Sequence, residues 1–219
     1  MKLQVALDLT EPSVAVDIAR RLCSAGGAVD IVEAGTPLIK AAGIFIVSAL
    51  KVACPNVEIM ADLKTMDVGA LEARLAINAG ANIVSVLGAA ANETISEFIN
   101  EARRLGGKPL IDMISVKDPA ARIKELLSAG LRPDYVGLHL GIDVQRSRGL
   151  TVEDLISEAV NIKNSYGLAV AIAGGINEEV APKIRGGTNI DVVVVGRAIT
   201  QAPDPVAAAK NIRRLLGID

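Results

Sequence analysis

The stretch ADLKTMDVG, residues 61–69, sets two carboxylates and one ammonium close together after a short apolar run. That run is typical of a buried strand, where ion pairing for stability gains little because desolvation costs about as much as the attraction returns. Residues two apart on a strand face the same way, so Asp62 and Lys64 would share a face if the strand continues past Asp62. Their attraction would keep both groups charged. Asp67 lies further on, near the expected start of a helix, and its spacing alone does not bring it into the same pocket.

More acids, and the only histidine of the chain, stand at the ends of other expected strands. These residues are Asp8, Glu33, Asp62, Asp112 and, just past the sixth strand, His139. One such acid alone would be expected to cap the following helix. Recurrence at equivalent positions instead favours a shared site, whereas an acid at the other end of a strand, such as Glu58, carries no such implication.

Two of these acids suit a metal ion, and the histidine suits proton transfer. Glu33 and Asp62 follow neighbouring strands, and two converging carboxylates would hold Mg²⁺, which takes oxygen ligands and keeps several waters. A single histidine and no cysteine cluster argue against structural zinc. His139 opens the segment HLGIDVQ (139–145), in a loop longer than its neighbours, so we expect a role in acid–base chemistry.

The last two strands are followed by glycines and an arginine. IAGGI (172–176) follows the seventh expected strand and VGRAI (195–199) the eighth. Glycines allow backbone N–H groups to approach an anion, and Arg197 can bind it through charge-assisted hydrogen bonds. The two segments together predict a phosphate site.

These residues require a scaffold that brings the strand ends together. Short apolar runs alternate with amphipathic helical stretches, as in a parallel sheet buried on both faces. Eight such units predict an α/β fold, a single (β/α)8 TIM barrel over residues 1–219, with an open doubly wound sheet as the alternative. The expected strands are 3–8, 29–33, 58–62, 82–86, 108–112, 134–138, 168–173 and 191–195.

Helix starts are indicated by an N-cap residue followed by proline. Asp118 precedes Pro119 and Asp204 precedes Pro205, in the order expected of an N-cap and a first helical residue. Thr151 with Asp154 resembles a capping box.

Composition limits the partners. The chain has 219 residues, 51% hydrophobic and 22% charged, with a net charge of −2, two Phe, two Tyr and no Trp. A nucleic-acid binder would need a basic face or stacking aromatics, so none is expected. No apolar run is long enough to span a membrane. Strand-like sequence begins at once, which leaves no room for a signal peptide. We therefore expect a cytoplasmic protein in which Cys23 and Cys54 are buried or half-buried free thiols.

With these residues in view, the whole chain resembles the orotidine-5′-phosphate decarboxylase superfamily. The segments that carry the resemblance are LDL at the first strand, EAGTPLI (33–39), ADLKTMDVG, HLGIDVQ, and the AGGI and VGRAI pair. The D-x-K-x-x-D pattern marks the superfamily. The H-x-G-x-D-x-Q pattern indicates its branch that joins formaldehyde to a pentulose phosphate.

The resemblance implies a reversible Mg²⁺-dependent aldol reaction. Formaldehyde would add to D-ribulose 5-phosphate, through an enediolate, to give D-arabino-hex-3-ulose 6-phosphate. It also implies a homodimer with shared sites, in which Asp67 of the partner subunit joins a charged network of Asp8, Asp62 and Lys64. Both the fixation of formaldehyde and the reverse supply of pentose phosphate fit this chemistry.

The resemblance also assigns roles to the site residues. Glu33 and Asp62 would hold Mg²⁺, and Lys64 would add positive charge beside the enediolate. His139 would move protons. The catalytic set is therefore Lys64, His139, Asp67, Asp62 and Asp8, and the substrate-binding set is Asp8, Lys64, Asp112, Gly175, Gly196 and Arg197, with the last three on the phosphate.

Three other functions stay open. A sister decarboxylase acting on 3-keto-L-gulonate 6-phosphate would carry arginine soon after the histidine, where this chain has Leu140 and, further on, Arg146 and Arg148. Orotidine-5′-phosphate decarboxylase needs no metal and would give Glu33 no role. A non-catalytic phosphosugar-binding barrel would explain the glycine segments but not the charged residues.

Overall fold

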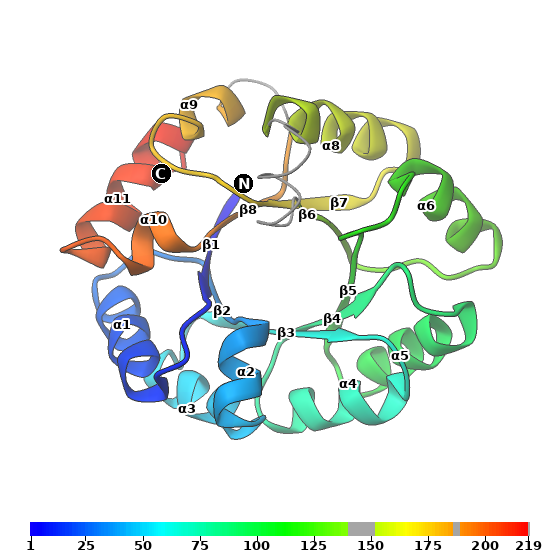
Figure 1. Ribbon diagram of the computed structural model, residues 1–219, viewed down its shortest axis with the longest axis horizontal. Helices are drawn as coiled ribbons and strands as arrows, with labels where there is room; N and C mark the ends of the chain where they lie inside the picture. The colour runs from blue at the N-terminus through cyan, green and yellow to red at the C-terminus, as the bar shows by residue number, and fades with distance from the viewer. Residues whose placement is uncertain (140–151, 186–188, 219) are drawn as a thin grey trace.

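Eight parallel strands close into a barrel in chain order (Figure 1). The computed structural model describes residues 1–139, 152–185 and 189–218. The (β/α)8 fold expected from the sequence is confirmed, and the open doubly wound sheet is excluded because β8 pairs with β1. The strands are β1 (Lys2–Leu7), β2 (Ile31–Ala34), β3 (Glu58–Thr65), β4 (Ile83–Leu87), β5 (Lys108–Asp112), β6 (Tyr135–His139), β7 (Ala169–Ala173) and β8 (Val192–Val195).

The helices form a ring outside the barrel (Figure 1). Within the described residues no single helix is long and apolar enough to cross a membrane, and only the pair α2 and α3, bent by 112°, reaches that length and composition. The helices are α1 (Pro12–Ser24), α2 (Thr36–Ala42), α3 (Phe45–Ala53), α4 (Gly69–Asn78), α5 (Asn92–Arg104), α6 (Pro119–Ser128), α8 (Val152–Tyr166), α9 (Ala181–Ile184), α10 (Arg197–Thr200) and α11 (Pro205–Leu216).

The N-cap predictions are confirmed where the chain is described. The Asp118 carboxylate accepts a hydrogen bond from the N–H of Ala121 at the start of α6. Asp204 does the same for Val206 and Ala207 at the start of α11. Thr151, the first residue of the expected capping box, lies outside the described residues.

The apolar core has two parts, because each strand presents alternate side chains to opposite faces. The larger part lies between the strands and the surrounding helices. The smaller part lies inside the barrel and consists of Ile31, Met60, Ile83, Leu110, Ala171 and Val192. This inner layer means that polar residues two positions further along β2 to β5 also face inward, above it.

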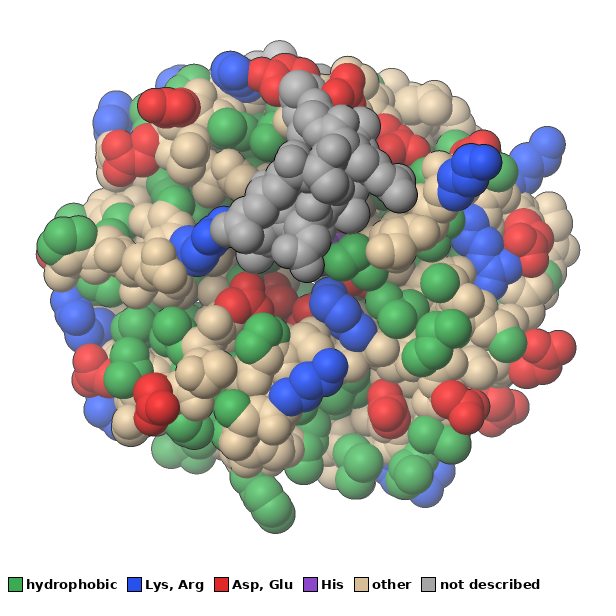
Figure 2. Space-filling view, in the orientation of Figure 1, with side chains coloured by type: hydrophobic (Ala, Val, Ile, Leu, Met, Phe, Trp, Pro, Cys, Tyr) green, Lys and Arg blue, Asp and Glu red, His purple; other side chains and the backbone are tan. Residues whose placement is uncertain are grey.

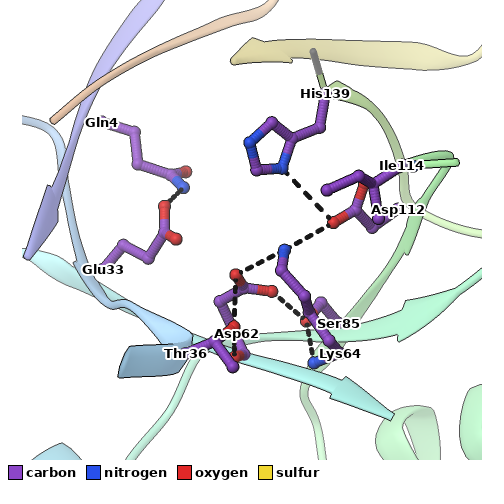
Figure 3. Close-up of polar contacts among 9 residues, drawn as sticks. All are labelled: Gln4, Glu33, Thr36, Asp62, Lys64, Ser85, Asp112, Ile114 and His139. Carbon is purple, nitrogen blue, oxygen red and sulfur yellow. Dashed lines mark hydrogen bonds and ion pairs between the residues drawn. The ribbon is translucent and has the colours of Figure 1, made fainter. Parts of the chain in front are cut away.

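The third strand is longer than the sequence analysis expected. It was predicted to end at Asp62, but β3 continues to Thr65. Its register with β4 shifts between Ala61 and Thr65, which pair with Val84 and Val86. The prediction was wrong because Asp62 was taken as the end of the strand, whereas the strand continues and Asp62 and Lys64 both face the inside of the barrel (Figure 3).

The two cysteines are not free thiols. Cys23, at the end of α1, forms a disulfide with Cys54, which follows α3. Their Cα atoms lie 5.4 Å apart although the residues are 31 positions apart in sequence. The expectation was wrong because it rested on spacing, while the packing of α1 against α3 decides their distance.

Candidate active site

A layer of polar side chains fills the mouth of the barrel above the inner apolar layer (Figure 3). Strand alternation places them, because each of those on β2 to β5 lies two residues after an inward apolar residue: Ile31 precedes Glu33, Met60 precedes Asp62, Ile83 precedes Ser85 and Leu110 precedes Asp112. Gln4 and His139 complete the layer from β1 and β6. The predicted meeting of strand ends thus brings Glu33, Asp62, Asp112 and His139 to one place.

Lys64 is held between two carboxylates. Its Nζ lies 2.8 Å from Oδ2 of Asp62 and 2.8 Å from Oδ2 of Asp112. Burial alone would lower the pKa of the Lys64 ammonium, but the two acids outweigh burial and raise the pKa above its ordinary value. Lys64 therefore stays positively charged at neutral pH, in a site where its side chain is 23% exposed.

Asp62 is itself fixed on both of its oxygens. The Ser85 hydroxyl donates to Oδ1 at 2.7 Å. The Thr36 hydroxyl, at the start of α2, lies 2.9 Å from Oδ2 and 2.8 Å from the backbone oxygen of Asp62. These contacts leave the Asp62 carboxylate with a defined orientation toward Lys64.

Asp112 links the lysine to the histidine. Its Oδ2 accepts from Lys64 and lies 3.7 Å from Nδ1 of His139, and its Oδ1 accepts the N–H of Ile114 at 2.9 Å. Burial would raise the pKa of Asp112, but His139 and Lys64 together bring it below its usual value. Asp112 is therefore an anion that can orient both neighbours.

Glu33 and Asp8 are acids with elevated pKa values. Burial, with Asp62 and Asp8 nearby, raises the pKa of Glu33 well above its ordinary value. The Gln4 amide donates to Oε2 of Glu33 at 2.5 Å. Burial and then Asp62 also raise the pKa of Asp8. Carboxylates gather here around the single ammonium of Lys64, so the site favours an added cation.

The backbone of Gly35 makes room for Asp8. A Cβ at position 35 would lie 2.1 Å from Oδ1 of Asp8. A side chain at position 35 would displace the Asp8 carboxylate, so glycine there keeps Asp8 in its present place.

The residues present fit a magnesium ion, although they do not form a complete cage. Within the described residues no group of three or more His, Cys, Asp or Glu side chains is arranged to hold a metal. Mg²⁺ commonly takes only one or two carboxylates and completes its shell with water and substrate oxygens. Glu33 and Asp62 are both buried, and burial together with Asp62 raises the pKa of Glu33, because a second negative charge is unfavourable there. A bound cation would offset that charge.

The glycine segments follow β7 and β8 at the same end of the barrel. Gly174 and Gly175 have φ of 117° and 67°, a region that favours glycine, so both are required by the turn. Gly196 caps α10, and Arg197 is its first residue. Arg197 is exposed and close enough to lower the pKa of Asp8. The expected phosphate-binding residues therefore border the acid cluster.

Asp67 lies apart from this cluster. It is exposed in the loop before α4, and its carboxylate accepts the N–H of Val68 at 2.8 Å. Among the described residues Lys64 forms ion pairs with Asp62 and Asp112 and not with Asp67. Leu140, Arg146 and Arg148, which bear on the decarboxylase alternative, lie outside the described residues.

Sequence reasoning missed Gln4, Thr36 and Ser85. Only the last residue of each expected strand was considered, and Ser85 lies one residue before the expected end of its strand. The signal that could have found it is the two-residue period, since Ser85 follows the inward Ile83 as Asp62 follows Met60.

A closed parallel barrel with charged residues at the carboxyl ends of its strands is the arrangement of a TIM-barrel enzyme. The sequence model of the Orotidine 5'-phosphate decarboxylase / HUMPS family matches residues 1–212. The chain belongs to this family.

Within the family, the chain is similar to synthases over its full length. It is 37% identical over 213 residues to a 3-hexulose-6-phosphate synthase of Mycobacterium gastri, covering 97% of this chain and 98% of that protein. The crystal structure of 3-hexulose-6-phosphate synthase from Salmonella typhimurium matches with a TM-score of 0.88 and 36% identity, over 99% of this chain and 98% of that one. A 3-keto-L-gulonate-6-phosphate decarboxylase from Vibrio cholerae matches with a TM-score of 0.83 and 28% identity, over 99% and 97% of the chains.

Proposed function

We propose that this protein is a 3-hexulose-6-phosphate synthase, a lyase that reversibly joins formaldehyde to D-ribulose 5-phosphate to form D-arabino-hex-3-ulose 6-phosphate. The observation that carries the proposal is Lys64 held between Asp62 and Asp112 at the mouth of a barrel whose full-length relatives bear that name. The decarboxylase alternative has the weaker support, at 28% identity. A non-catalytic barrel would leave this buried charge network without a role.

The reaction requires a proton to leave the carbon beside the ribulose carbonyl, which produces an enediolate. His139 is the side chain suited to move protons, since it faces the mouth beside Asp112 and remains 28% exposed. The Lys64 ammonium supplies a fixed positive charge where the enediolate oxygens would gather negative charge. Asp112 keeps both groups oriented.

The phosphate of the substrate would bind at Gly175, Gly196 and Arg197. Backbone N–H groups and a guanidinium suit a phosphate, and this end of the barrel commonly holds one. Binding there would supply the energy that positions the reacting end of the sugar.

Mg²⁺ is part of the proposal. Held by Glu33 and Asp62, it would act as a Lewis acid for the oxygens of the substrate. The chain's own residues prepare the position, since Gln4 holds Glu33, and Ser85 and Thr36 hold Asp62.

We further propose a homodimer in which Asp67 completes the site of the partner subunit. Exposed apolar side chains occur on α3, on α4 and in the loop before α4 that carries Asp67, and hydrophobic groups line the lower edge of Figure 2, where α3 and α4 lie. The side chains are Phe45, Val52, Met66, Val68, Leu71 and Leu75, between 48% and 82% exposed. Val68 also has φ of 48°, which is rare for a β-branched residue, and on this proposal contacts with the partner subunit would help to hold it.

A cytoplasmic location belongs to the same proposal, because the substrates are phosphorylated sugars of central metabolism. The Cys23–Cys54 disulfide bears on that location, because a disulfide needs surroundings in which it stays oxidised. Disulfides persist in the cytoplasm mainly in hyperthermophiles, so a reducing cytoplasm of another kind would hold the two thiols unpaired.

The decisive measurement is formaldehyde consumption with ribulose 5-phosphate, with and without Mg²⁺, beside carbon dioxide release from 3-keto-L-gulonate 6-phosphate. We expect formaldehyde to disappear only when pentulose phosphate and Mg²⁺ are both present, and EDTA to abolish the reaction. Carbon dioxide release without formaldehyde consumption would move the assignment to the decarboxylase. If neither reaction occurred while ribulose 5-phosphate bound independently of Mg²⁺, a binding protein would be the better description.

A further inference from the structure

We propose that Ser85 is a positioning residue of this site, acting through Asp62 and Lys64. Ser85 lies on β4 and is fully buried. Its hydroxyl donates to Oδ1 of Asp62 at 2.7 Å and accepts the backbone N–H of Lys64 at 3.1 Å (Figure 3). One hydroxyl thus joins the side chain of the acid to the main chain of the lysine.

The register of the sheet explains why a side chain is needed here. Ala61 pairs with Val84 and Thr65 pairs with Val86, so β3 advances by four residues while β4 advances by two. The backbone of the extra segment is out of step with the regular ladder, and a backbone N–H that is shielded from water and has no acceptor is unfavourable. The Ser85 hydroxyl takes the place of the ladder carbonyl for the N–H of Lys64.

Lys64 also has an unusual backbone conformation. Its φ is 48°, in the left-handed region that residues with a Cβ rarely adopt. Such a conformation persists where surrounding contacts fix it. Ser85 supplies one of those contacts, at the residue whose ammonium must reach both Asp62 and Asp112.

The same hydroxyl also fixes the orientation of the Asp62 carboxylate. Ser85 occupies Oδ1, while Oδ2 faces the Lys64 ammonium. A hydroxyl both donates and accepts through one atom, so serine or threonine at this position can serve Asp62 and the Lys64 N–H together. Ser85 itself is fully buried, so it acts by holding Asp62 and Lys64.

This inference rests on the proposed function for its kinetic test. In Ser85→Ala we expect kcat to fall by about 10- to 100-fold, the usual cost of removing a group that orients a ligating side chain. The KM for ribulose 5-phosphate should change little, because the expected phosphate residues are on other strands. Ser85→Thr retains the hydroxyl and should recover most of kcat. Ser48→Ala is the matched control, since it removes a serine hydrogen bond to Ala79 away from the site and should leave kcat unchanged.

A second readout needs no turnover. Amide hydrogen exchange of Lys64, followed by NMR, should be at least about tenfold faster in Ser85→Ala than in the parent protein and restored in Ser85→Thr, as expected when a buried N–H loses a bond worth about 1.4 kcal/mol. Thermal unfolding establishes that each variant is folded.

Unchanged kcat and unchanged Lys64 exchange in Ser85→Ala would overturn the inference. So would an equal loss in folded Ser85→Ala and Ser85→Thr, because the hydroxyl would then not be the active feature. A parent protein with no synthase activity would instead refute the proposed function, and the exchange measurement would still decide the role of Ser85.

Discussion

At the scale of single residues, the site brings together carboxylates whose pKa values shift in opposite directions. Glu33 and Asp8 have raised pKa values because burial and neighbouring acids oppose their ionisation. Asp112, equally buried, has a lowered pKa because a histidine and an ammonium face it. The mouth of the barrel therefore holds Glu33, whose charge a bound cation would offset, and Asp112, an anion that already contacts Lys64 and His139.

The raised pKa of Glu33 predicts a stability effect of defined sign. The folded chain binds this proton more tightly than the unfolded chain, so the stabilisation is complete at low pH and is lost as pH rises through the folded pKa. In EDTA at pH 8, Glu33→Gln should therefore raise the free energy of unfolding by roughly 0.5–2 kcal/mol. The gain should vanish below about pH 4.3, where an unfolded glutamate is also protonated. Urea unfolding across this pH range measures it.

Glu58→Gln is the control with the opposite sign. Burial would raise the pKa of Glu58, but hydrogen bonds from Lys108 and Lys2 lower it. This variant should unfold more easily than the parent protein at pH 8, and the difference should shrink as pH falls through the folded pKa of Glu58. A Glu33→Gln protein less stable than its parent at pH 8 would contradict the assignment of Glu33 as a buried, destabilising charge.

The strand-end acids could be predicted at this scale, but their partners could not. Asp8, Glu33, Asp62 and Asp112 were predicted to meet because parallel strands end at one edge. The two-residue period could have shown that Ser85 faces inward, but one serine in an apolar run is common, and its contact with the N–H of Lys64 depends on a register shift on the neighbouring strand. Local sequence does not show a register shift between two strands.

At the scale of elements, the two ends of the barrel do different work. Acids at the starts of strands form ion pairs with cations, as Glu58 does with Lys2 and Lys108, and Asp30 with Arg213. Acids at the carboxyl ends of strands surround the candidate site. Strand direction alone distinguishes the two sets, so they can be told apart in the sequence.

The Cys23–Cys54 disulfide belongs to the end away from the site, where α1 and α3 finish. Closing a loop of 31 residues removes disorder from the unfolded chain and should stabilise the fold by about 3 to 4 kcal/mol. We therefore expect a reducing agent to lower the urea midpoint of the protein while leaving activity at moderate temperature intact. Cys23→Ser should show the lowered midpoint already and not respond to the reducing agent. A parent protein indifferent to reduction would contradict the pairing.

At the scale of the whole molecule, the described contacts within one chain do not bring Asp67 into the candidate site. Asp67 is exposed, and its loop and the helix that follows carry exposed apolar side chains. The barrel and most of the site could be predicted from the sequence because both follow from strand order within one chain. The setting of Asp67 could not, because on our proposal it depends on a second chain.

Mixing two inactive variants tests this sharing. Asp67→Ala and Lys64→Ala protomers should each be inactive as homodimers, whereas a heterodimer regains one site that holds both groups. We expect turnover to appear on co-refolding or co-expression, with heterodimers isolated by two different affinity tags. Far-UV circular dichroism of each variant checks that the barrel is intact. Isolated heterodimers without activity would count against a site shared between subunits.

The disulfide has a further consequence for the integrity of the enzyme. The segment that it closes, between Cys23 and Cys54, contains β2 and α2, and hence Glu33, Gly35 and Thr36. A protease that nicks the backbone once inside this segment produces two fragments that remain covalently joined. Strand β2 also stays hydrogen-bonded between β1 and β3. A nicked enzyme therefore keeps its candidate metal ligand in place for as long as the disulfide remains oxidised.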